Sequence, residues 1–174
     1  MKLSKLFPVF SVIAALLLSV SAFAQTETFS DANVEYTFEL PEATWKQTVK
    51  PSTISPNVEY VFGERQNGHL EVRKLSVKSD ALLADTIRDE EQKLQFLPGY
   101  VAGKEEDFKG SLNGKVFNYE FVRSGRNMSG RFYFLKAADD KVYVLRFDGL
   151  RDKLRPIRNQ TDSIARTFDL KKSK

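Results

Sequence analysis

The sequence predicts an α+β fold, an α-β-α layered domain in which a central antiparallel sheet is flanked by two helices. Several segments alternate apolar and polar residues at period two, the pattern of strands with one buried face. Two other segments, about 81–96 and about 157–168, carry apolar residues at helical spacing. The last strands follow one another through short connections, which favours antiparallel pairing because parallel strands need long crossovers.

The chain begins with the pattern of a secretory signal peptide. Lys2 and Lys5 precede an uncharged, largely apolar stretch at residues 7–20, and an A-x-A motif ends at Ala24. The stretch could instead be an uncleaved anchor, but it is near the lower limit for crossing a bilayer, about 20 residues. We therefore predict cleavage between Ala24 and Gln25 and export to the periplasm or the medium.

Residues 1–24 are thus assigned to the signal peptide and residues 25–174 to one domain, with its core at about 34–170. No second apolar run is present in the sequence, so we expect no membrane span after signal removal. The absence of cysteine means that the domain must be stabilised by packing without disulfides. We expect it to be a monomer.

For the first half of the domain, the sequence predicts an irregular N-terminal segment followed by strands. Gln25–Asn33 is polar, whereas Val34–Leu40 alternates as a strand that Pro41 ends. Trp45, the only tryptophan, is expected to fill one end of the core. Residues 49–57 are expected to form a loop.

Two further strands, Val58–Phe62 and His69–Val77, are separated by an Asn-Gly turn signal at 67–68. The apolar residues of the second strand change parity part-way along, which predicts a β-bulge near Arg73-Lys74. His69 is the only histidine in the chain, and we expect it at a turn or strand edge.

The segment Ala81–Phe96 predicts an amphipathic helix with Ser79 or Asp80 as its N-cap, and Pro98-Gly99 ends it. In the polar stretch 100–115 we expect one short strand at about 107–112. Three aromatic-rich strands then form an antiparallel meander, with a turn region at 124–129. These strands are Val116–Val122, Gly130–Lys136 and Lys141–Phe147.

Gly149 is expected to turn the chain into its closing helix. Residues 150–154 begin a helical segment, and Pro156 is tolerated only in the first turn of the main helix. One face of that helix is expected to pack on the sheet. It carries Ile157, Thr161, Ile164 and Phe168.

Charge is unevenly distributed along the chain. Residues 141–174 contain ten basic and four acidic residues, whereas residues 25–140 contain fifteen basic and nineteen acidic ones. Cations near a helix N-terminus oppose the helix dipole, so local stability does not explain those around Pro156. We predict a partner-binding surface, and an acidic partner, at Arg151, Lys153, Arg155 and Arg158.

No pattern of catalytic residues is found in the sequence. A single histidine cannot supply a usual zinc site, and the acidic runs 89–91 and 105–107 lack calcium-loop spacing and are expected to be solvated. Gly-rich phosphate loops are absent. Arginines near residues 123–131 suggest nucleic-acid binding, but export and a small net charge argue against it. We predict no catalytic residue, no metal and no cofactor.

The order of elements resembles the PsbP-like superfamily, which includes the PsbP subunit of photosystem II, bacterial DcrB-like envelope proteins and a small Ran-binding nuclear import factor. The resemblance spans about Val34–Leu170, although the lipid-anchor cysteine of DcrB-like proteins is missing. It implies an α-β-α layered fold in proteins that mostly bind or organise other proteins. The residues that carry it are Phe38-x-x-Pro41-x-x-x-Trp45, and Val142–Phe147 followed by Ile157, Ile164 and Phe168.

Two functions are therefore considered. The first is an exported, non-enzymatic protein-binding or assembly module of the cell envelope. The alternative is a periplasmic small-ligand carrier or hydrolase with a pocket between the sheet and the helix at 81–96, for which only the richness in aromatic residues argues.

Overall fold

The computed structural model describes residues 26–79 and 81–172, so the predicted signal peptide, its cleavage site at Ala24 and Gln25, and Asp80 lie outside the described residues. Strands dominate the chain, and helices stand at its middle and end. The elements are β1 (Glu27–Ser30), β2 (Tyr36–Leu40), β3 (Trp45–Val49), β4 (Val58–Phe62), β5 (His69–Ser76), α1 (Leu83–Leu94), β6 (Val101–Phe108), β7 (Gly114–Arg123), β8 (Arg126–Ala138), β9 (Lys141–Leu150), α2 (Arg151–Leu154), α3 (Arg158–Thr167) and β10 (Asp169–Leu170).

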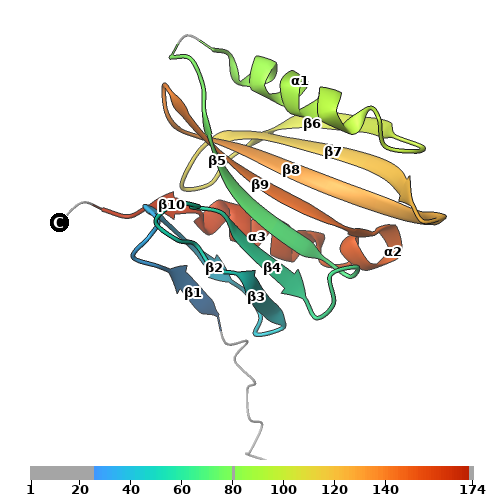
Figure 1. Cartoon of the computed structure of the whole chain (residues 1–174), viewed down its shortest axis with the longest axis horizontal. Coiled ribbons are helices and arrows are strands. Elements are labelled where there is room, and N and C mark those ends of the chain that lie inside the picture. Colours follow the sequence, from blue (N-terminus) through green and yellow to red (C-terminus); the bar gives the residue numbers. More distant parts are fainter. Residues whose placement is uncertain (1–25, 80, 173–174) are drawn as a thin grey trace, which may run out of the picture.

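The central sheet has seven strands in the order β3-β4-β5-β9-β8-β7-β6, and every neighbouring pair is antiparallel. Figure 1 shows α1 over one face of this sheet and α3 beneath the other. The predicted α+β class, the flanking helices and the meander of the last strands are therefore confirmed. None of the described helices is long and apolar enough to cross a bilayer.

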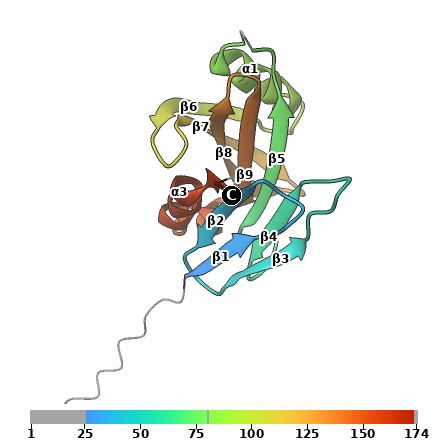
Figure 2. The ribbon, with the colours of Figure 1, turned by 90° about the vertical axis from the view of Figure 1, so that its left-hand side faces the viewer.

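A second, smaller sheet lies beside α3 and was not predicted (Figure 2). It has the order β1-β2-β10, with Phe29 opposite Phe38 in the register. The expectation of an irregular segment at residues 25–33 was therefore wrong. The segment is mostly polar, but it contains one buried side chain. This is Phe29, whose ring lies 4.8 Å from that of Phe38.

The sheet separates two hydrophobic cores, and this explains the change of parity in β5. Leu70 and Val72 face the core that β2 and α3 cover, whereas Leu75 packs against the core beneath α1. The predicted bulge near Arg73-Lys74 is absent, because β5 pairs with β9 in continuous register from His69 to Ser76. A strand with both faces covered carries apolar residues on both parities.

Several predicted boundaries are corrected. The N-cap of α1 is Leu82, without a side-chain hydrogen bond, rather than Ser79. β6 begins at Val101, earlier than the strand expected at about 107–112, and seven of its eight residues are exposed. An exposed edge strand shows no alternation of burial, and period-two patterning therefore could not reveal it.

Two turns also differ from expectation. The region 124–129 is a two-residue hairpin at Ser124-Gly125, with φ angles of 52° and 72°, as in a type I′ turn. Gly149 does not turn the chain but lies inside β9. A Cβ there would come within 3.1 Å of the Asn67 carbonyl oxygen, so glycine permits the close approach of the β4–β5 turn. Trp45 is buried as expected, although it begins β3.

Candidate functional site: a basic pocket between the sheet and the α2–α3 corner

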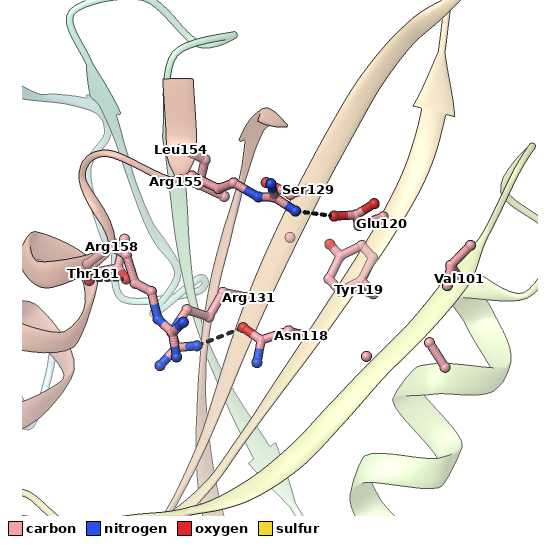
Figure 3. A pocket seen from close by; sticks show the side chains of 13 residues that line it. Val101, Asn118, Tyr119, Glu120, Ser129, Arg131, Leu154, Arg155, Arg158 and Thr161 are labelled. Carbon is pink, nitrogen blue, oxygen red and sulfur yellow. Dashed lines mark hydrogen bonds and ion pairs between the residues drawn. The ribbon is translucent and has the colours of Figure 1, made fainter. Parts of the chain in front are cut away.

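The four basic residues predicted to bind a partner lie around the corner between α2 and α3, and the structure brings two of them together. Arg155 and Arg158 line a pocket with a volume of about 290 Å³ (Figure 3). Arg151 and Lys153 line a separate depression beside Arg126, although Arg151 also pairs with Glu120 of the pocket. The predicted surface is therefore divided between two places.

The pocket has a floor of strands and a wall of helix. Val101, Ala102 and Gly103 of β6 form one end of the floor, and neighbouring residues of β7 and β8 continue it. Arg155, in the turn between α2 and α3, and Arg158, at the start of α3, stand on the wall. The lining residues are Val101, Ala102, Gly103, Asn118, Tyr119, Glu120, Ser129, Gly130, Arg131, Leu154, Arg155, Arg158 and Thr161.

Glu120 of β7 bridges the sheet to the basic corner. Arg155 Nη2 donates to Glu120 Oε1 at 2.9 Å, and Arg151 Nη1 donates to Oε2 of the same carboxylate at 3.2 Å. Arg155 is well exposed, with 67% of its side chain accessible, and Arg151 and Glu120 are partly exposed, at 42% and 38%. Ion pairs this exposed contribute little to stability, because water solvates both charges when they separate.

Arg131 forms a rigid, fully paired base to the pocket and was not predicted to belong to it. Its guanidinium donates to Asn118 Oδ1 at 2.6 Å, to Asp162 Oδ1 at 2.7 Å and to the Tyr133 hydroxyl at 2.6 Å. Burial raises the pKa of Tyr133 well above its ordinary range, so this hydroxyl stays protonated. The network joins β8 to α3 and fixes the floor relative to the wall.

Arg158 differs from Arg131 in that the part of the chain described by the structure provides no ion-pair partner for it. It is exposed and is the first residue of α3, whose first turn contains no acidic residue and whose N-cap makes no side-chain hydrogen bond. An arginine at this end is disfavoured by the helix dipole. An anion in the pocket would relieve that repulsion.

His69 was expected at a turn or strand edge, and this was wrong. It begins β5, an inner strand between β4 and β9, and only 5% of it is exposed. Its Nδ1 lies 3.1 Å from Asp148 Oδ1 and its Nε2 lies 2.8 Å from Glu59 Oε2. Burial alone would lower the pKa of His69, but the hydrogen bonds to these two carboxylates raise it overall.

The acidic runs occupy different environments. Glu105, Glu106 and Asp107 are exposed on β6, as expected. Glu90 of the run 89–91 is buried instead, because Arg73 Nη2 donates to its Oε2 at 2.8 Å. Within residues 26–79 and 81–172, no group of three or more acidic or histidine side chains is placed to hold a metal ion.

The alternative hypothesis requires a pocket between α1 and the sheet. A hollow of about 270 Å³ does lie there, lined in part by Leu94, Leu97 and Phe132. Its charged side chains largely neutralise one another, since Glu90 pairs with both Arg73 and Lys93. The hollow therefore provides a place for a ligand beside charges that are already paired.

Comparison with known proteins finds matches to the fold of this chain but none to its sequence. No protein-family model matches the chain, and no curated protein sequence does. Among solved structures, the Ran-binding protein Mog1p of Saccharomyces cerevisiae superposes with a TM-score of 0.61 at 10% identity, over 84% of this chain and 96% of Mog1p. Cyanobacterial PsbP (CyanoP) of Synechocystis gives 0.56 at 14% identity, over 87% of this chain and 96% of CyanoP. The chain has the PsbP-like fold.

A third structure with this fold is LpqN of Mycobacterium tuberculosis, described as involved in cell envelope biogenesis. It matches with a TM-score of 0.54 at 15% identity, over 85% of this chain and 91% of LpqN. The resemblance inferred from sequence is thus confirmed as a likeness of fold. At these identities nothing about partners or sites is transferred from the neighbours to this chain.

Proposed function

We propose that this PsbP-like protein is an exported, non-enzymatic module of the cell envelope that binds an acidic protein partner at the pocket between β6–β8 and the α2–α3 corner. The observation that carries the proposal is the position of Arg158, an exposed cation at a helix N-terminus beside Arg155. Such an arrangement costs stability in the free protein and gains stability when an anionic group binds.

The structural neighbours support the general class. One of them is a Ran-binding protein, and another takes part in cell envelope biogenesis. The sequence adds the signal-peptide pattern at residues 1–24, which supports export. The lack of a catalytic pattern in the sequence and the paired charges in the second hollow favour binding over hydrolysis.

The proposal is tested by affinity capture from an envelope extract, using charge reversal at the pocket. Arg155→Glu together with Arg158→Glu should abolish recovery of a defined acidic protein that the wild type retains. Lys153→Glu reverses one charge at the same corner and is the control, because Lys153 is exposed and does not line the pocket. Equal recovery by all three proteins would contradict the proposal.

Export is tested separately on the full-length chain. N-terminal sequencing of the protein from a periplasmic fraction should give Gln25 as the first residue. Recovery of the uncleaved chain in the membrane fraction would instead favour the anchor. Cytoplasmic recovery would remove the envelope from the proposal.

A further inference from the structure

The pocket contains a carboxylate of its own at the place where a partner's carboxylate would bind. Glu120 reaches from β7 to the guanidiniums of Arg151 and Arg155, at 3.2 Å and 2.9 Å. Glu120 precedes Arg151 by 31 residues and Arg155 by 35, and between 38% and 67% of each of the three side chains is exposed. The contact is therefore not needed to bury charge, and it can open without exposing the core.

Positive charge in the pocket nevertheless exceeds what Glu120 neutralises. Arg158 has no ion-pair partner among the residues that the structure describes, and it stands at the uncapped start of α3. On the floor, the Ser129 hydroxyl is shielded from solvent and makes no hydrogen bond. An oxyanion placed between the wall and the floor would meet the free cation of Arg158, whereas the Ser129 hydroxyl, which solvent does not reach, could donate to it only after being uncovered.

The remaining lining favours a carboxylate on an apolar stem over a bare ion. Val101 is 59% exposed and Leu154 is buried, and together they give the pocket apolar sides. A glutamate side chain has two methylene groups that such sides would cover. The volume of about 290 Å³ has room for a side chain of this size.

We infer that Glu120 pairs with Arg155 in the free protein in the way that a carboxylate of an acidic peptide segment does in the complex, and therefore competes with it. On binding, a glutamate side chain of the partner enters between Arg155 and Arg158, and Arg155 leaves Glu120 to pair with it. Glu120 thus lowers the affinity of the free site and restricts binding to segments with enough negative charge to compete. This inference rests on the proposed function and adds to it the ligand chemistry and an internal competitor.

The test is isothermal titration of the purified domain with an acetylated, amidated tetraglutamate peptide at low salt. Because an exposed ion pair is easily opened, Glu120→Gln should tighten binding by about threefold to fivefold. Arg158→Gln should weaken binding by about tenfold, the effect of losing one charge-assisted hydrogen bond. Glu106→Gln removes one negative charge from exposed β6 outside the pocket and is the matched control, expected to change little.

Three results would overturn the inference. Weaker binding by Glu120→Gln would mean that Glu120 organises the site rather than competes for it. Equal tightening by Glu120→Gln and Glu106→Gln would reduce the effect to net charge. Equal affinity for the peptide and for inorganic phosphate would mean that the site takes any anion and does not recognise a side chain.

Failure here is distinguishable from failure of the proposed function. If envelope capture depends on Arg155 and Arg158 while Glu120→Gln leaves peptide affinity unchanged, the binding module stands and the internal competitor does not. If capture is independent of both arginines, the proposed function fails whatever the peptide shows.

Discussion

Replacing His69 by leucine tests whether the buried charge cluster on the α1 side of the sheet stabilises the protein. The substitution removes a cation between Asp148, whose side chain is 7% exposed, and Glu59, which is 25% exposed. Asp148 keeps an ion pair with Arg123, at 3.4 Å, and the nearby charge of Arg146, whereas Glu59 keeps Arg65, at 3.1 Å. Breaking a buried pair on one side typically costs about 3–5 kcal/mol, and these remaining partners reduce our expectation to about 2–3 kcal/mol.

The same cluster predicts how stability depends on pH. The carboxylates raise the pKa of His69 above its ordinary value of 6.5, despite the opposing effect of burial. A raised folded-state pKa gives stability that is fully present below pH 6.5 and is lost as pH rises through the folded value. The free energy of unfolding of the wild type should therefore fall above pH 6.5, and that of His69→Leu should lack this component.

Two carboxylates of the cluster determine how the stability changes at acidic pH. Burial alone would raise the pKa values of Asp148 and Glu59, but their hydrogen bonds to His69 hold both below their ordinary range. Their contribution is present above the ordinary carboxyl pKa and is lost as pH falls. Stability should thus be greatest between the ordinary pKa values of the carboxyls and of histidine.

Urea unfolding followed by the fluorescence of Trp45 measures both effects at pH 6 and at pH 9. The control is the double variant His69→Leu/Asp148→Leu, which should recover part of the loss, since replacing both members of a buried pair by apolar residues is often close to neutral. A cost below about 1 kcal/mol for His69→Leu, or one that is identical at both pH values, would refute the reasoning.

Three further substitutions test the packing. A Cβ at Gly130 would lie 2.0 Å from the Tyr119 ring, so Gly130→Ala should cost about 2–3 kcal/mol by urea unfolding and far less in a Tyr119→Leu background. Gln160 accepts the indole N–H of Trp45 at 2.9 Å, and Gln160→Leu should lower stability by about 1–2 kcal/mol, measured as a lower denaturation midpoint with an unchanged slope. Phe168 is fully buried, so Phe168→Ala should cost about 3–5 kcal/mol, and a thermal midpoint near that of the wild type would contradict its assignment to the core.

Elements with one strongly buried face were predictable from sequence. The stripe Ile157, Thr161, Ile164 packs on the sheet as its helical spacing required, because each of these residues is buried. The meander followed from short connections between alternating segments. In both cases local periodicity and tertiary packing agree, which is the condition under which sequence patterns are informative.

Elements at the edges of the fold were not predictable in the same way. β6 is exposed along nearly its whole length, and β1 has a single buried residue, Phe29. Neither shows a period to detect. The wrong prediction of a bulge in β5 has the opposite cause. Both faces of this strand are covered, so its apolar residues occupy both odd and even positions.

Only part of the candidate site could be predicted from the sequence. The basic cluster around Pro156 stood out because it opposes a helix dipole, and this drew attention to Arg155 and Arg158. Glu120 gave no local signal, and the arginines near residues 123–131 included Arg131 without connecting it to this pocket, since both residues reach it through strand pairing. His69 was misread for the same reason, as its partners Glu59 and Asp148 are 10 and 79 residues distant.

The place where an acidic segment binds is the central claim, and it can be measured directly. Arginine side-chain Nε–Hε signals of the ¹⁵N-labelled protein can be followed while tetraglutamate peptide is added. The pocket predicts that the signals of Arg155 and Arg158 shift together with a single dissociation constant, while that of Arg166, exposed at the far end of α3, does not. Shifts spread evenly over the exposed arginines, with Arg158 no different from Arg166, would contradict it.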